Sequence, residues 1–332
     1  MSSLGSERDL IERIRRRLPA APPSLIVPPG DDAAVVVPER GAFQVLTTDA
    51  VVEGIHFDRR FSTLADVGYR AIAVNASDIA AMGGTPSLAL LSFLLPAATS
   101  VEDVDALLDG ILEMAAEAKL AVAGGNLSRS PGPLVVDVAM TGYVRPRRIL
   151  TRGGGRPGDA LYVTGSLGAA AAGLEWLRET GDEAALSEEM AECLRRHRRP
   201  KARLRAGSLL GRNRAATACM DLSDGLADAV RQIAESSGTG ATVDAGAVPI
   251  HPGAATWFTS RGRDPLLSAV AGGDDYELLV TVPRKAAGRL RGVQRASRGL
   301  AFTRVGELTR ESDVVLVRDG RRQPMPGGFS HF

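Results

Sequence analysis

The pattern of apolar and polar positions predicts a chain in which helices and strands alternate. Leucines and an isoleucine recur at helical spacing between Val101 and Lys119, and an apolar stretch predicts another helix from about Leu64 to Met82. Further helices are expected at about 166–180, 187–196 and 200–211, and strands at about 87–95, 134–144, 218–221, 276–282, 303–308 and 314–317. Two β-branched runs, GDDAAVVVPE and FQVLTTDAVVEGIHF, predict neighbouring strands, and a short strand is expected to end in GGN. Because both kinds of element occur in each half, the pattern predicts an α/β (α+β) fold.

The length of the chain and one break in the pattern predict two domains. The 332 residues are about twice the usual size of a domain. Residues 145–158 are rich in Arg, Gly and Pro and lie between a predicted strand and the next one. We therefore expect an amino-terminal domain at 1–148 and a carboxyl-terminal α/β domain at 149–332.

Composition and charge exclude several classes of partner. Forty Lys and Arg residues balance 39 acidic residues, so the net charge of +1 gives no global field for nucleic acid or an anionic membrane. The two cysteines lack CxxC spacing, which argues against a disulfide framework or a thiolate zinc site. The polar amino terminus, with Ser6 as the expected N-cap of a helix, has no signal-peptide pattern. The longest apolar run, 88–98, is too short to span a bilayer, so we expect a cytoplasmic protein.

The segment 74–84, VNASDIAAMGG, places Asn75, Ser77 and Asp78 in an otherwise apolar helix. A helix that is apolar all round is normally buried, and an ionised carboxylate there requires a cation, a metal ion or several hydrogen-bond donors. Residues three apart share a helix face, so Asn75 and Asp78 are expected to point the same way. The alternative is a buried Asp that caps a neighbouring loop.

Other acidic residues gather at the ends of predicted strands. They are Asp31 and Asp32 before a strand, Asp49 after one, Asp221 and Asp224 in DLSDG, and Asp274 and Asp275 in GGDDYEL. Adjacent carboxylates repel each other, so such clusters favour cation binding, and an oxygen-only set favours magnesium. For any one pair, and for DLSDG in particular, a turn or a helix cap is the alternative.

The glycine-rich segments give weaker signals. GGN at 124–126 and the pair 272–273 would allow a backbone to approach a phosphate, although double glycines are common in turns. The GxGxxG match at 153–158 leads into a strand rather than a helix, which argues against a dinucleotide fold, and GxxxxGK[ST] is absent. His56 could contact a phosphate or be a satisfied polar residue, and the Arg run at 195–199 is expected to be a solvated helix end.

Together these motifs resemble the thiamine-monophosphate kinase family, over nearly the whole chain. The residues that carry the resemblance are GDDAAVV, TTDAVVEGIHF, AVNASDIAAMGG, GGN, TRGG, DLSDGLADA, GGDDYEL and the terminal GGFSHF. That family belongs to a superfamily of ATP-binding enzymes that includes aminoimidazole ribonucleotide synthetase. The resemblance implies ATP-dependent phosphorylation of thiamine monophosphate to thiamine diphosphate. It also implies a homodimer in which the amino-terminal sheets pair.

The resemblance also implies roles for individual residues. The magnesium set would be Asp32, Thr47, Thr48, Asp49, Asp78, Asn126, Asp221 and Asp224. Gly125, Asn126, Arg152 and Ser223 would contact ATP, and His56, Asp274 and Phe329 would contact the substrate. Two positions depart from the family pattern, since position 126 is often Asp and position 274 is usually Glu.

No general base is expected in this reaction. A phosphate monoester has a second pKa of about 6, so the attacking oxygen is already mostly deprotonated at neutral pH. Catalysis would then consist of positioning two anions in line and neutralising their charge with several magnesium ions, without a phosphoenzyme. The alternatives are another enzyme of the superfamily or a non-catalytic nucleotide-binding homologue. Selenophosphate synthetase is disfavoured because no Cys lies near the amino terminus.

Overall fold

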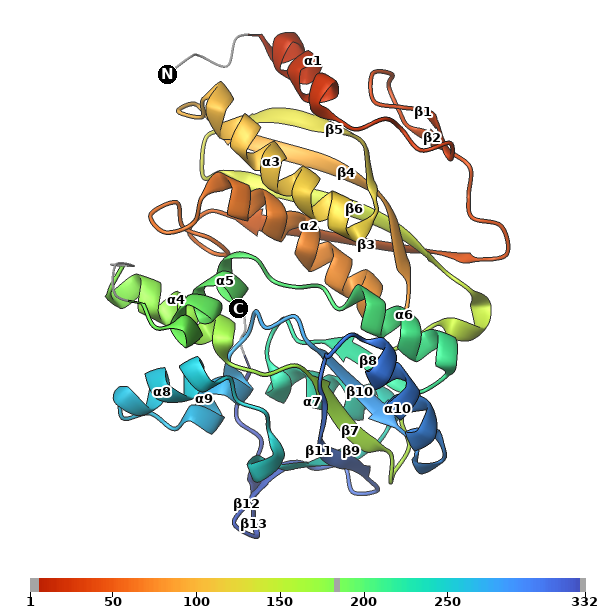
Figure 1. The fold of residues 1–332 in the computed structure, drawn as a ribbon, viewed down its shortest axis with the longest axis vertical. Coiled ribbons are helices and arrows are strands. Elements are labelled where there is room, and N and C mark those ends of the chain that lie inside the picture. The colour runs from red at the N-terminus through yellow and green to blue at the C-terminus, as the bar shows by residue number, and fades with distance from the viewer. Residues whose placement is uncertain (1–5, 182–185, 329–332) are drawn as a thin grey trace. The chain divides into compact units, whose positions relative to one another are not determined.

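The computed structural model describes residues 6–181 and 186–328, which form two compact units (Figure 1). The first unit contains residues 1–79 and 85–146, and the second contains residues 80–84 and 147–332. Within the described ranges, none of the helices combines the length and the apolar composition needed to cross a membrane.

The first unit is a four-stranded sheet covered on one face by two helices, α2 and α3 (Figure 1). Its elements are α1 (Glu7–Arg17), β1 (Leu25–Val27), β2 (Val35–Val36), β3 (Phe43–Val52), α2 (Leu64–Ala81), β4 (Thr85–Pro96), α3 (Val101–Ala118), β5 (Ala121–Ser130) and β6 (Val135–Val144). The strand order is β3-β6-β4-β5; β4 and β5 run parallel, and the other pairs are antiparallel. Strand β3 therefore lies at an open edge of the sheet.

Two glycines let α2 and α3 pack with their backbones in direct contact. A Cβ atom on Gly110 would lie 1.7 Å from the carbonyl oxygen of Ala65, and one on Gly68 would lie 2.0 Å from that of Leu107. Only glycine fits at such distances. The close packing completes the burial of α2, whose Ile72 is fully buried, as the apolar pattern predicts.

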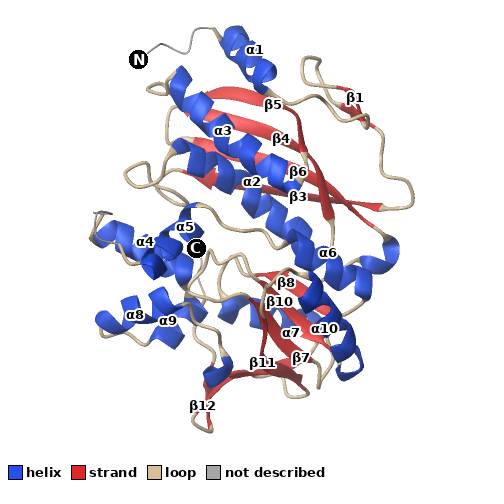
Figure 2. Cartoon of the chain, in the orientation of Figure 1, coloured by secondary structure: helices blue, strands red, loops and turns tan. Residues whose placement is uncertain are grey.

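The second unit contains a seven-stranded sheet with helices on both faces (Figure 2). Its elements are β7 (Ala160–Thr164), α4 (Ala169–Glu179), α5 (Glu188–Arg198), α6 (Leu204–Asn213), β8 (Ala218–Asp221), α7 (Leu226–Ser237), β9 (Gly240–Asp244), α8 (Pro252–Ser260), α9 (Pro265–Ala271), β10 (Leu278–Val282), α10 (Ala287–Ala296), β11 (Phe302–Thr309), β12 (Val314–Arg318) and β13 (Arg321–Pro324). The strand order is β13-β12-β9-β11-β7-β10-β8. Side chains alternate along β10: Leu279 packs with the α7 core, whereas Leu278 and Val280 pack with the core under α6 and α10.

The mixed α/β class is confirmed, and so is the start of the first helix. Ser6 is the N-cap of α1, and it forms a capping box with Asp9. The pattern did not predict β9, β13, α8, α9 or α10, which are short or lack strong periodicity.

Three local predictions were wrong. The two β-branched runs near Asp32 and Asp49 are not neighbouring strands, because β2 pairs with β1 and β3 pairs with β6. Asp49 does not follow a strand but lies inside β3. The GGN segment does not end its strand, since β5 continues to Ser130 along its parallel partner β4.

Candidate functional site

Polar residues of β3 and α2 contact each other in the layer between these two elements. The hydroxyl of Thr47 donates a hydrogen bond to Asp78 Oδ2 at 2.5 Å, so the odd-numbered side chains of β3 face α2. Asp49 lies two residues from Thr47 and therefore faces the same way. Asn75, one helical turn before Asp78, donates to the carbonyl oxygen of Asp49 at 3.4 Å. The structure thus brings Thr47, Asp49 and Asp78 together, with Asn75 beside them.

Thr48 belongs to the opposite face of the sheet. Its exposed hydroxyl donates a hydrogen bond to Asp137 Oδ1 of β6 at 3.2 Å. Because successive side chains of a strand point to opposite faces of the sheet, the hydroxyls of Thr47 and Thr48 cannot both bind the same cation. Asp137 was not expected to be part of the site, because it follows apolar residues in an ordinary strand pattern.

Asp32, Gly125 and Asn126 line one cavity of about 410 Å³ in the first unit. Gly125 is required there by packing, since a Cβ atom would lie 2.1 Å from the carbonyl oxygen of Leu91. Gly30 opens the GDD motif with φ at +133°, and a Cβ atom would lie 2.4 Å from the guanidinium group of Arg15. Gly125 therefore packs directly against the backbone of β4, whereas Gly30 lies beside the guanidinium group of Arg15, which also lines the cavity.

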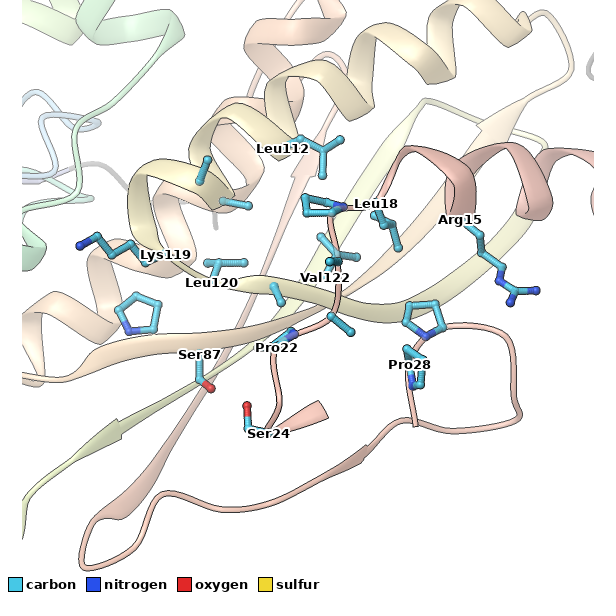
Figure 3. A pocket seen from close by; sticks show the side chains of 18 of the residues that line it. Arg15, Leu18, Pro22, Ser24, Pro28, Ser87, Leu112, Lys119, Leu120 and Val122 are labelled. Atoms are coloured by element: carbon cyan, nitrogen blue, oxygen red, sulfur yellow. The ribbon is translucent and has the colours of Figure 1, made fainter. Parts of the chain in front are cut away.

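A larger cavity of about 820 Å³ in the same unit is lined mainly by apolar side chains, among them Leu18, Leu112 and Leu120 (Figure 3). Arg15 lines this cavity as well as the smaller one. None of the expected ligand residues is among its described lining residues. The larger cavity therefore gives no support for the predicted site.

His56 lies in the turn that follows β3. Its backbone N–H donates to the carbonyl oxygen of Val52 at 2.9 Å, and its Nδ1 accepts a hydrogen bond from the N–H of Val52 at 3.1 Å. Because Nδ1 is an acceptor, the neutral ring carries its proton on Nε2. The ring is thus fixed in orientation by the backbone.

In the second unit, backbone hydrogen bonds join DLSDG to GGDDYEL. The N–H of Asp274 donates to the carbonyl oxygen of Ser223 at 2.7 Å, and the N–H of Tyr276 donates to that of Leu222 at 2.9 Å. Asp221 pairs with Leu278 in the β8–β10 ladder. The N-cap of α7 is Gly225, so neither the Asp nor the Ser residues of DLSDG occupy the N-cap position of that helix.

The GGDDYEL turn is strained. Asp274 has φ at +68° and Tyr276 has φ at +49°, values that residues other than glycine rarely adopt. The Tyr276 hydroxyl donates to Asp274 Oδ1 at 3.3 Å, and the buried His197 lies 4.0 Å from Asp274 Oδ2. Strain of this kind costs on the order of 1–3 kcal/mol and clusters at functional sites.

Asp275, between these two residues, caps a distant helix. Its Oδ2 accepts a hydrogen bond from the N–H of Gly168 at 2.7 Å, and Gly168 is the N-cap of α4. Burial raises the pKa of Asp275 to about 7, and the hydrogen bond from Gly168 opposes that rise. From the sequence, Asp275 was expected to belong to a cation-binding acidic cluster, whereas in the structure its carboxylate caps α4, which only the fold brings to it.

We expect Asp275→Asn to flatten the pH dependence of stability. Because the folded-state pKa exceeds the ordinary value of 3.8, folding favours the protonated acid. Its contribution is fully present below about pH 4 and is lost as pH rises through about 7. The amide keeps an acceptor for Gly168, so at pH 8 the variant should be more stable by at least about 1 kcal/mol. Urea unfolding of both proteins between pH 4 and 8 measures this, and parallel curves would contradict it.

Glu277, at the end of the motif, is buried in an ion pair. Arg203 forms a bidentate contact with its carboxylate, and the hydroxyl of Thr164 donates to Oε2 at 2.6 Å. Arg196 approaches Oε1 at 3.6 Å. The expectation of a solvated helix end at 195–199 was therefore wrong for Arg196 and His197, whose side chains are largely buried.

Arg152 and Gly328, the last described residue, lie near α7. Arg152 donates a hydrogen bond to Gln232 of α7. A Cβ atom on Gly328 would lie 3.0 Å from the carbonyl oxygen of Asp224, so the last described residue packs against DLSDG. Phe329, an expected substrate contact, lies outside the described residues.

The acids do not form one dense cluster within either unit. Among residues 6–181 and 186–328, no group of three or more His, Cys, Asp or Glu side chains is placed to hold a metal ion. The candidate ligands instead form small sets: Thr47, Asp49 and Asp78; Asp32 with Asn126; and Asp221, Ser223 and Asp224.

Family models and related proteins identify the chain. Residues 30–144 match the AIR synthase related protein N-terminal domain, and residues 156–319 match the C-terminal domain. A thiamine-monophosphate kinase of Bacillus subtilis is 32% identical over 313 residues, covering 91% of this chain and 92% of the relative. The chain belongs to the thiamine-monophosphate kinase family.

Solved structures of this family share the fold. The thiamine-monophosphate kinase of Stenotrophomonas maltophilia is similar with a TM-score of 0.85 and 32% identity, covering 96% of this chain and 98% of that one. A structure described as AaThiL complexed with AMPPCP and TMP has a TM-score of 0.78 and 32% identity, covering 99% and 97%. The two-domain α/β expectation and the family resemblance are thereby confirmed.

Proposed function

We propose that this protein transfers the γ-phosphate of ATP to thiamine monophosphate, giving thiamine diphosphate and ADP by direct in-line displacement. The observation that carries the proposal is the similarity, over 99% of the chain, to the structure described as a complex with AMPPCP and TMP. The residues expected to bind cations all fall within the ranges that the family models match, 30–144 and 156–319.

The chain supplies oxygen ligands that fit magnesium. Thr47, Asp49 and Asp78 present only hydroxyl and carboxylate oxygens, and the Thr47 hydrogen bond places two of these side chains side by side. The small size of each set also fits, because Mg²⁺ commonly keeps several waters and takes only one or two carboxylates together with substrate phosphates. When bound, the cations would neutralise charge on the transferring phosphoryl group.

The remaining task of the chain is to position the two anionic substrates. Gly125 and Asn126 lie beside Asp32 in one cavity, which suits a phosphate that must approach both a backbone and a cation ligand. In the second unit, the hydrogen bond from the N–H of Asp274 to Ser223 holds the expected substrate contact beside the expected ATP contact. In-line transfer then needs no side-chain base, since the attacking phosphate oxygen is already deprotonated at neutral pH.

We also propose that two copies pair through the open face of the first sheet. The side chains of β3 that face away from α2 include Leu46, which is 70% exposed, and Leu90 of β4 on the same face is 46% exposed. Burying such a face in a second copy would remove apolar surface from water. Sedimentation velocity tests this: the wild type should be a dimer, and Leu46→Arg should shift the protein toward monomer.

A cytoplasmic location of the protein stays an expectation from the sequence.

The decisive experiment is a turnover assay with a choice of acceptor. With Mg²⁺ and ATP, the protein should convert thiamine monophosphate to thiamine diphosphate, whereas free thiamine should give no product because it lacks the attacking phosphate. Chromatography of the products measures both reactions. Phosphorylation of free thiamine would overturn the acceptor assignment, and net retention at a chiral γ-phosphorus would overturn direct in-line transfer.

A further inference from the structure

Asn75 is a fully buried amide in the middle of α2. Its Nδ2 donates to the carbonyl oxygen of Ala71, one turn earlier, at 3.0 Å, and to that of Asp49 in β3 at 3.4 Å. Both partners are acceptors, so the nitrogen must face them and the orientation of the amide is settled. The side chain therefore fastens the backbone of Asp49 to the helix.

The other end of the amide has no protein partner. Oδ1 of Asn75 is buried, and it accepts no hydrogen bond from the described part of the chain. A buried acceptor left unsatisfied costs about 1–3 kcal/mol, and such groups are usually satisfied by an ordered water or an ion. Leu or Met at this position would fill the space without that cost, so stability alone does not explain the amide.

The orphaned oxygen belongs to the layer that contains the candidate cation ligands. Asn75 and Asp78 share one face of α2, because residues three apart are neighbours on a helix. Asp78 reaches Thr47 of β3, and Asn75 reaches the backbone of Asp49 two residues further along the same strand. The two helical side chains thus face adjacent positions of the strand that carries Asp49.

We propose that Asn75 is a positioning residue for a divalent cation held by Asp49 and Asp78. Its Nδ2 fixes the strand that carries Asp49, and its Oδ1 accepts a hydrogen bond from a water molecule of the cation's hydration shell. This inference rests on the proposed function for the identity of the cation, but it concerns binding and not turnover. Partners that orient metal ligands and waters typically contribute 10–100-fold to metal affinity.

The test is Asn75→Leu, measured by Mn²⁺ titration with electron paramagnetic resonance, without nucleotide or turnover. We expect Mn²⁺ affinity to fall at least about tenfold. Thermal stability without metal should be unchanged or raised, because the variant removes a buried unsatisfied acceptor. A purely structural amide would give the opposite pattern, with stability lost and affinity kept.

Two further variants sharpen the result. Ser77→Ala is the matched control, because Ser77 is equally buried in α2 but lies two residues away and does not share the face of Asn75. Its Mn²⁺ affinity should equal that of the wild type. If Asn75→Leu fails to fold, Asn75→Ser takes its place with the same expected loss.

The outcomes separate this inference from the proposed function. Unchanged Mn²⁺ affinity in Asn75→Leu, or a wild type that binds no Mn²⁺, overturns the inference even if thiamine monophosphate is phosphorylated. Weakened binding in Asn75→Leu supports the inference even if the wild type fails the turnover assay, which would overturn only the proposed function.

Discussion

Asp78→Asn is expected to lower the turnover of thiamine monophosphate by about 10²–10³-fold while leaving the fold intact. Removal of one group that stabilises developing charge typically costs that much. The amide keeps an oxygen that can accept the hydrogen bond of Thr47, so the contact between β3 and α2 should survive. Steady-state kinetics at saturating Mg²⁺, together with a thermal melt, measures both effects. A variant with wild-type turnover would show that Asp78 is structural.

Asp66→Asn is the matched control for that experiment. Asp66 lies in the first turn of the same helix and accepts hydrogen bonds from the N–H and the hydroxyl of Thr63. Weakening these two hydrogen bonds at the start of the helix should cost about 1 kcal/mol of stability. Turnover should be unchanged at temperatures below the melt, which separates loss of stability from loss of chemistry.

Arg203→Met is expected to destabilise the protein by about 3 kcal/mol. Glu277 is fully buried, and loss of one partner of a buried ion pair leaves a charge without compensation, which typically costs 3–5 kcal/mol. The lower end applies because Arg196 remains 3.6 Å from Glu277. Urea unfolding at pH 7 measures the loss, and a change below about 1 kcal/mol would contradict the assignment.

The double variant Arg203→Met with Glu277→Leu provides the control. Replacing both partners by apolar groups is often neutral, so the double variant should recover most of the loss seen in Arg203→Met alone. Together with the wild type and the single variant Glu277→Leu, these two variants form a double-mutant cycle whose coupling energy isolates the pair. Losses that simply add would mean that the two side chains contribute independently.

Local pattern predicted the elements well where the signal is strong. The helices at Leu64–Ala81 and Val101–Ala118 agree with the sequence to within a residue or two, because many apolar positions at one period specify each of them. Pattern did not predict which strands are neighbours. Val35 and Val36 pair with β1 instead of with β3, and the length of a β-branched run carries no information about its partner.

The candidate site was likewise predicted in part from the sequence and in part only from the structure. The motifs predicted that Asp49 and Asp78 are both important, but not that Thr48 turns away from them toward Asp137. The exposed and buried faces of a strand follow from its packing, and the sequence assigned no face to the polar residues 47–49. The roles of Asp275 and Glu277 depend on Gly168 and Arg203, which lie far from them along the chain.

The sequence by itself determined the family, the mixed α/β class and the residue types that carry the chemistry, because those depend on local periodicity and on motifs of fixed spacing. Only the tertiary structure decided which groups each of these side chains contacts. It placed Thr47 and Asp49 against α2, left Oδ1 of Asn75 without a protein donor, and made Asp275 the cap of α4. Such contacts join segments far apart along the chain, and their distances and burial follow from packing that no local pattern encodes.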